Sequence, residues 1–171
     1  MSGGETSRIR ELVLPFIHPG MCGLDLGYGG DSLSPNTINV DKVKKYTNYN
    51  DDPQHLFGDA RRLRWFTNEV FDYIYSSHLL EDFPPEETRT VLREWLRVLK
   101  PLGLLMLYLP NEKRYRAHCA ANDPAQYNQN HQCLEMSLEY MVAIYEELKV
   151  HVDLAHDEVD GYSFLIIGRK T

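Results

Sequence analysis

Short apolar runs alternate along the chain with longer segments whose apolar residues recur every three or four positions. The short runs are typical of buried strands, and the longer spacing is typical of helices that pack on a sheet. This order predicts an α/β fold, in which helices cover the faces of a sheet. The strands are expected at residues 21–26, 37–40, 56–58, 70–76, 104–109, 150–154 and 163–167.

Three segments have the spacing of amphipathic helices. Residues 6–17 carry apolar side chains at helical intervals, although Pro15 is expected to cut this helix short. Residues 84–99 give the strongest pattern, because prolines and acidic residues stand at the start and basic residues near the end. The third helix is expected at residues 137–148. The expected buried stripe of the second helix is Val91, Leu92, Trp95, Val98 and Leu99.

A glycine-rich turn follows the first predicted strand, in the sequence GLDLGYGGDSLSPNTINVD (23–41). Glycine has no Cβ, so it lets the backbone turn sharply and approach a ligand closely. Six residues separate Gly30 from Thr37, which is too few for a full crossover helix. The acidic residues and glycines of this stretch are Asp25, Gly27, Gly29, Gly30 and Asp41. The pattern predicts a nucleoside site, and the alternative is a turn between two core strands without a ligand.

The composition narrows the class of protein. The 171 residues, 43% of them hydrophobic and 25% charged, fit one globular domain over residues 1–171. A net charge of −7 argues against a broad nucleic-acid-binding face. The chain shows no membrane-length apolar run and no signal peptide, so we expect a cytoplasmic protein without membrane contact. Three cysteines without a CxxC pair, and histidines without ligand spacing, give no reason to expect a metal site.

Two polar stretches interrupt the pattern of strands and helices. Residues 42–53 are expected to form a loop, and residues 61–67 a brief helical turn. The longer stretch, 111–133, follows the fifth predicted strand and is expected to be a functional loop or a lid. Both tryptophans, Trp65 and Trp95, are expected in the core.

Five segments together resemble class I S-adenosylmethionine-dependent methyltransferases, over about residues 20–170. They are GLDLGYGG (23–30), INVD (38–41), GDA (58–60), FDYIYSSHLLEDF (71–83) and EWLRVLKPLGLLMLYLP (94–110). The last two are the most diagnostic, because they resemble the pattern FDxIxSxHxLEH…EWxRVLKPGGxLxLxxP of small members. The resemblance implies a Rossmann-like sheet, mostly parallel with an antiparallel last strand and with helices on both faces. It also implies S-adenosylmethionine as the cofactor.

The resemblance assigns cofactor roles to the residues Asp25, Gly27, Gly29, Gly30, Asp41, Asp59, Ala60 and Ser76. It implies that Asp25 lies under the methionine part and that the glycine turn passes beside it. It further implies that Asp41 accepts hydrogen bonds from the ribose and that Asp59, with the backbone N–H of Ala60, reads the adenine edge. The alternatives are a turn cap for Asp25 and ordinary loop carboxylates for the other two aspartates.

The chain departs from the family pattern at three positions. Asp31 stands in place of a third glycine, Tyr28 in place of a frequent cysteine, and Leu102 in place of the first glycine of PGG. None of these changes removes the implied site. A dinucleotide-binding domain is the rival, but its GxGxxG pattern needs glycine where Ser32 stands and a helix for which there is no room.

Methyl transfer of this kind is an in-line displacement, so the protein must hold the acceptor atom about 3 Å from the methyl group. His78 follows the fourth predicted strand and is the candidate base for a hydroxyl acceptor; the alternative is a packing or capping role. His118 and His131 are further candidates in the long insert, where residues 114–116 (Arg-Tyr-Arg) could bind an anionic acceptor; the alternative is a solvated lid.

We expect a small-molecule acceptor and no nucleic acid, because no separate substrate domain is attached. The second hypothesis is a cofactor-binding domain that does not methylate and acts as a regulator or subunit. A homodimer or a partner subunit stays open under either hypothesis.

Overall fold

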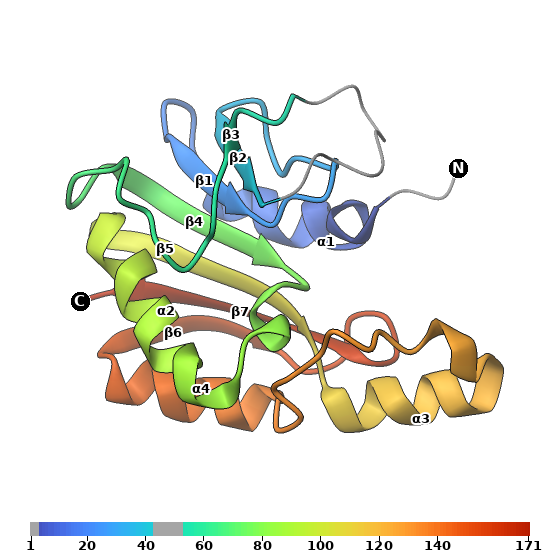
Figure 1. Ribbon diagram of the computed structural model, residues 1–171. Helices are drawn as coiled ribbons and strands as arrows, with labels where there is room; N and C mark the ends of the chain where they lie inside the picture. Colours follow the sequence, from blue (N-terminus) through green and yellow to red (C-terminus); the bar gives the residue numbers. More distant parts are fainter. Residues whose placement is uncertain (1–3, 43–52) are drawn as a thin grey trace.

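The computed structural model describes residues 4–42 and 53–171, which form one seven-stranded sheet in the order β3-β2-β1-β4-β5-β7-β6 (Figure 1). Strands β1 to β5 pair in parallel, and β7 is antiparallel to both β5 and β6. The expected sheet, mostly parallel with an antiparallel last strand, is therefore confirmed. The strands are β1 Gly23–Leu26, β2 Thr37–Asp41, β3 Leu56–Phe57, β4 Phe71–Ser77, β5 Leu99–Pro110, β6 Val150–His156 and β7 Ser163–Lys170.

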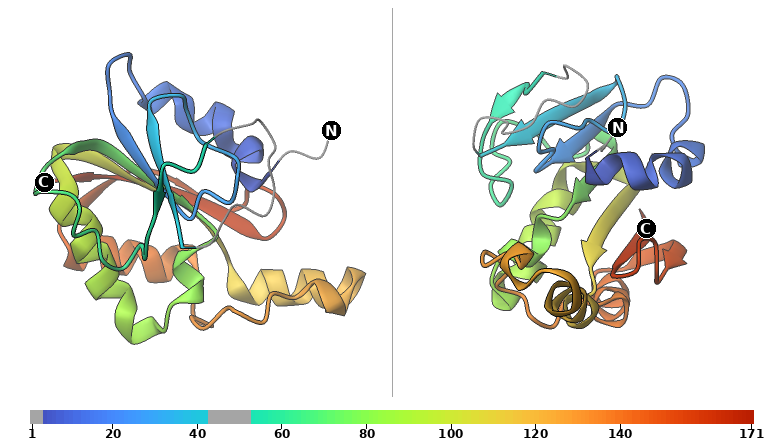
Figure 2. Two further views of the ribbon diagram at one scale, coloured as in Figure 1. Left: turned by 45° about the horizontal axis from the view of Figure 1, so that its top comes forward. Right: turned by 90° about the vertical axis from the view of Figure 1, so that its right-hand side faces the viewer.

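Helices cover both faces of this sheet, as Figure 2 shows from two directions. The α-helices are α1 Glu5–Val13, α2 Pro85–Val98, α3 Glu112–Asn122 and α4 Leu138–Glu147; short 3-10 turns are η1 Leu14–Phe16, η2 Leu80–Asp82 and η3 Pro124–Gln126. Helix α1 packs on one face, whereas α2 and α4 pack on the other. None of the helices among the described residues is long and apolar enough to cross a membrane.

The two faces have separate cores because side chains alternate along each strand. In β5, Leu105 and Leu107 join Trp95 of α2 in the larger core, while Met106 and Tyr108 join α1 in the smaller one. The continuous apolar run of β5 is explained by this arrangement, since a strand inside a sheet that is covered on both faces is buried on both sides.

Some of the remaining sequence predictions are confirmed by the structure and others are wrong. The connection between β1 and β2 contains no helix, as expected, and the first helix ends at Val13, where a 3-10 turn containing Pro15 follows. Residues 61–67 form turns rather than a helical turn. Trp95 is fully buried, but the prediction for Trp65 is wrong, since 52% of it is exposed. Most of the loop predicted at 42–53 lies outside the described residues.

The sequence does not predict helix α3, because the polar residues 111–133 indicate a loop or a lid. The helix has no apolar stripe, and only Glu112 and Cys119 in it are buried. Its start is fixed locally by the side chain of Asn111, which accepts a hydrogen bond from the backbone N–H of Arg114. The helix extends away from the sheet (Figure 1), so it lacks the buried face that makes a helix visible in sequence.

Gly23 marks the tightest contact between β1 and β4. A Cβ at this position would lie 1.9 Å from the ring of Tyr73, its partner on β4. The Tyr73 hydroxyl shares hydrogen bonds with Thr37 and Ser34, so the ring cannot easily move away.

Replacing Gly23 with alanine should therefore destabilise the protein by roughly 1–3 kcal/mol or more through overpacking. Urea denaturation of G23A against the parent measures this. In the Tyr73→Leu background the same substitution should cost much less, because the ring is gone. An equal cost in both backgrounds would show that the ring is not the obstacle.

Candidate functional site

The candidate site lies where the carboxyl ends of β1, β2 and β4 meet. The backbone after β1 turns through Gly27, Gly29 and Gly30, all with positive φ (72°, 60° and 105°). The turn is tied to β2, because the Gly27 N–H donates to the Val40 carbonyl at 2.9 Å and the Gly29 N–H to Asp41 Oδ2 at 3.3 Å. The sequence thus brings the glycine turn and Asp41 together, as it predicts.

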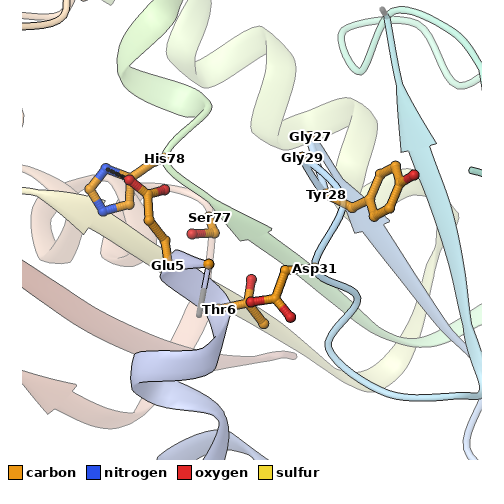
Figure 3. Close-up of a pocket in the computed structure, with 9 residues that line it drawn as sticks. Glu5, Thr6, Gly27, Tyr28, Gly29, Asp31, Ser77 and His78 are labelled. Carbon is orange, nitrogen blue, oxygen red and sulfur yellow. Dashed lines mark ion pairs between the residues drawn. The ribbon is translucent and has the colours of Figure 1, made fainter. Parts of the chain in front are cut away.

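Helix α1 forms one wall of the cavity beside this turn. Asp31 holds it there: its carboxylate accepts hydrogen bonds from the backbone N–H and hydroxyl of Ser7 and pairs with Arg10. The aspartate that replaces the family's third glycine thereby docks the helix onto the turn. The cavity, shown in Figure 3, is lined by Gly4, Glu5, Thr6, Gly27, Tyr28, Gly29, Asp31, Ser77 and His78.

A second cavity lies on the other side of the turn and is mostly apolar. Its lining residues are Gly27, Val40, Asp41, Lys42, Gly58, Asp59, Ala60, Arg61, Leu79 and Phe83. Asp59 faces it, but its carboxylate already accepts hydrogen bonds from the side chain and backbone N–H of Arg61. These bonds lower the pKa of Asp59 to about 2, so the group is ionised at neutral pH.

Asp25 and Ser76 are buried beneath the turn and line none of these cavities. Asp25 Oδ2 accepts a hydrogen bond from the Leu33 N–H at 3.2 Å, and burial raises the pKa of its carboxyl well above the usual range. The Ser76 hydroxyl donates to the Leu26 carbonyl at 2.8 Å and so joins β4 to β1. Both side chains support the turn from below, which matches the alternative of a turn cap for Asp25.

His78 lies directly after β4 in a left-handed backbone conformation, with φ of 46°. Its N–H donates to the Tyr108 carbonyl, and its ring packs edge-on against the Tyr108 ring at 5.0 Å. Nε2 lies 3.3 Å from the Ser163 hydroxyl, while Nδ1 faces two carboxyl groups, those of Glu5 and Glu81. Burial lowers the pKa of His78 to about 3, so the imidazole is neutral near pH 7.

A third cavity joins the first two and opens toward the segment after α3. It shares Gly27, Asp41 and His78 with them and adds three carboxamides, those of Asn128, Asn130 and Gln132. The backbone carbonyl of Glu81 accepts hydrogen bonds from the N–H groups of Gln132 and Cys133, which anchors the segment beside the cleft. The long insert therefore does face the site, and its amides give the cavity a neutral polar wall.

The charged and aromatic candidates of the insert are engaged elsewhere. Arg114 pairs with Asp157 and Arg116 with Glu112, so neither points a spare charge at the cleft. His118 stacks on Tyr162 at 4.9 Å. His131 is buried, with Nδ1 at 2.8 Å from Glu112 and Nε2 at 3.7 Å from Glu81.

Sequence reasoning did not single out several lining residues. Leu79 and Phe83 stand inside the diagnostic segment 71–83, and their position after β4 was a usable signal. Glu5 and Thr6 carried no signal, because α1 reaches the cleft through tertiary contacts, among them that of Ser7 with Asp31. Among the described residues, no group of three or more histidine, cysteine or acidic side chains could hold a metal ion.

The chain is similar in sequence to one family model, described as a methyltransferase domain, over residues 25–107. No curated protein matches it in sequence.

Solved structures share its fold at low identity. An S-adenosylmethionine-dependent methyltransferase of Mesorhizobium loti is 10% identical, with a TM-score of 0.71 and coverage of 95% of this chain and 98% of that one. Magnesium protoporphyrin IX methyltransferase of Synechocystis, solved with S-adenosylhomocysteine, is 13% identical, with a TM-score of 0.70 and coverage of 97% and 82%. A methyltransferase of Haloferax volcanii, solved in complex with the Trm112 activator, is 17% identical, with a TM-score of 0.66 and coverage of 95% and 88%.

Proposed function

We propose that the chain, whose residues 25–107 match a methyltransferase-domain family model, transfers a methyl group from S-adenosylmethionine to the hydroxyl oxygen of a small-molecule acceptor. The observation that carries this proposal is a continuous cleft: the three cavities share Gly27, and Asp41 and His78 each line two of them. One end of the cleft is closed by α1 and the other by Leu79 and Phe83. Through the third cavity an acceptor can reach the middle of the cleft, where His78 lies.

The residues of the cleft fit the parts of the cofactor. Gly27 has a φ of 72° and a Cβ there would lie 3.0 Å from the Leu79 side chain, so glycine is favoured where the backbone passes between the two cavities. We assign the ribose hydroxyls to the Asp41 carboxylate, since hydrogen bonds to a charged acceptor stabilise by about 1.5–3 kcal/mol each. The apolar cavity with Asp59 and Ala60 suits the adenine.

The glycine turn with α1 suits the amino-acid end of the cofactor, with Asp25 and Ser76 supporting it from beneath. Gly30 continues the turn toward Asp31, which holds the helix in place. When bound, the cofactor supplies an electrophilic methyl group on a sulfonium. The protein's own task is then to orient the acceptor and to exclude water from the reacting atoms.

His78 lies where the cavities join and is the residue that we place beside the acceptor oxygen. In its neutral form it is a hydrogen-bonding group rather than a charge, which suits a site that must also hold a cationic sulfonium. The side-chain amides of Asn128, Asn130 and Gln132 can bind both hydrogen-bond donors and hydrogen-bond acceptors of a ligand. These features support a small polar acceptor.

The first test is calorimetric titration with S-adenosylmethionine and S-adenosylhomocysteine. We expect micromolar binding by the parent protein and a loss of roughly a hundredfold or more in Asp41→Ala, because two charge-assisted hydrogen bonds disappear. Asp153→Ala, on the edge strand β6, is the matched control and should bind normally. Absence of binding by the folded parent would refute the proposal.

A second candidate function is cofactor binding without methyl transfer, in a regulator or a subunit. The complex of the Haloferax volcanii relative with an activator gives this candidate its support, and it leaves a partner subunit or a homodimer open for this chain.

Transfer of labelled methyl groups to a panel of small hydroxyl compounds separates the two candidates. In His78→Asn, which tolerates the left-handed backbone, we expect turnover to fall by roughly a hundredfold with cofactor affinity unchanged. Binding without any transfer, alone and with candidate activators, would favour the regulator. Full turnover by the variant would remove His78 from the site.

A further inference from the structure

Glu5, the first residue of α1, points into the cleft beside His78 (Figure 3). Its Oε1 lies 3.8 Å from His78 Nδ1, and it lines the same cavity as the glycine turn. About 47% of its side chain is exposed, so the carboxyl can exchange protons with solvent while it faces the cleft. Asp31 fixes this position, because it anchors α1 at Ser7.

A second carboxyl group, that of Glu81, faces the same nitrogen. Its Oε1 lies 3.5 Å from His78 Nδ1 and 3.7 Å from His131 Nε2, and its side chain has no exposed surface. Neither oxygen accepts a hydrogen bond from the described residues. Burial raises the pKa of Glu81 well above the usual range, which favours the neutral form of this carboxyl group.

The environment of Glu5 differs from that of Glu81. Although nearly half of its side chain is exposed, desolvation by the surrounding protein raises the pKa of Glu5 to about 7. Arg8, one turn along α1, acts in the opposite direction, while Asp160 and Asp82 raise the pKa further and His131 lowers it. The two carboxyl groups that face one imidazole thus differ in burial and in the charged neighbours that shift their pKa values, as acid–base pairs in enzymes do.

His78 is not a strong base in this arrangement. Two carboxyl groups face Nδ1 and only the Ser163 hydroxyl faces Nε2, so the proton of the neutral ring is favoured on Nδ1. With the proton there, the Nδ1–H faces Glu81 at 3.5 Å and Glu5 at 3.8 Å, and Nε2 accepts from the Ser163 hydroxyl at 3.3 Å. The ring can then orient the Glu5 carboxylate, and Glu5 is the half-exposed carboxyl group beside His78 that can take up a proton.

We propose that Glu5 is the catalytic base of this site and that His78 is the positioning residue that orients its carboxylate toward the acceptor. The inference rests on the proposed function, since it names the base for a hydroxyl acceptor. As the acceptor oxygen forms its bond to the methyl carbon, the carbon–sulfur bond breaks and its electron pair stays on sulfur. The O–H proton passes to Glu5 and then to solvent, which reaches the exposed half of the Glu5 side chain.

The proposal fixes the direction of the pH dependence. Only ionised Glu5 can take a proton, so methyl transfer should rise with pH through about 7 and level off above it. Removing the Nδ1–H of His78 should raise the pKa of Glu5, because that donor stabilises the carboxylate.

The test is carbon-13 NMR of glutamate carboxyl groups from pH 5 to 9, with S-adenosylhomocysteine as the bound probe. We expect one glutamate to titrate near pH 7 in the parent protein, in Glu81→Gln and in the matched control Glu11→Gln on the same helix. The signal should vanish in Glu5→Gln and Glu5→Ala, and its midpoint should move upward in His78→Asn. With a hydroxyl acceptor from the methyl-transfer panel, the rise of rate near pH 7 should disappear in Glu5→Gln, with a loss of roughly a hundredfold in kcat.

A Glu5 carboxyl that titrates at the ordinary glutamate range, or a step near pH 7 that survives in both Glu5 variants, would overturn the proposal. So would an unchanged rate profile in Glu5→Gln. Calorimetry with S-adenosylhomocysteine separates this failure from failure of the proposed function. If the parent and Glu5→Gln bind equally, the cofactor site stands whatever the role of Glu5; if the parent does not bind, the proposed function itself fails.

Discussion

The arrangement of the site depends on one ion-paired anchor, the carboxylate of Asp31. Through Ser7 and Arg10 it fastens the first helix to the turn that follows β1. The connection from β1 to β2 is too short for a crossover helix, so the backbone turn alone would leave the cleft open on that side. Helix α1 supplies the missing wall, and the same contact brings Glu5 to His78. A departure from the family's glycine pattern is thereby explained as a docking residue.

The charge of each carboxyl group in the cleft depends on how deeply that group is buried in the protein. Asp41 and Asp59 lie at its surface, and Arg61 holds Asp59 ionised. Asp25 and Glu81 lie beneath it, where burial favours their neutral forms. Glu5 lies between these extremes, with about 47% of its side chain exposed. One fold thus holds carboxyl groups for hydrogen bonding, for packing and for proton transfer, because their burial differs.

The sequence predicted the parts that depend on local pattern. The strands, the helix α2 and the positions of Gly27, Gly29 and Asp41 follow from apolar spacing and from the need for glycine at positive φ. Helix α3 was not predicted, because it has no apolar face. The exposure of Trp65 was not predicted either, because tryptophan is usually buried. Glu5 could not be found from the sequence, since its role depends on a contact between residues 24 positions apart.

The central claim is that the cleft between α1, the glycine turn and residues 79–83 holds S-adenosylmethionine. A crystal structure with S-adenosylhomocysteine tests it most directly. The account predicts ribose hydroxyls on the Asp41 carboxylate, adenine against Leu79 and Phe83, and the amino-acid end between the glycine turn and α1. A saturated crystal with this cleft empty, or with the ligand bound elsewhere, would contradict it.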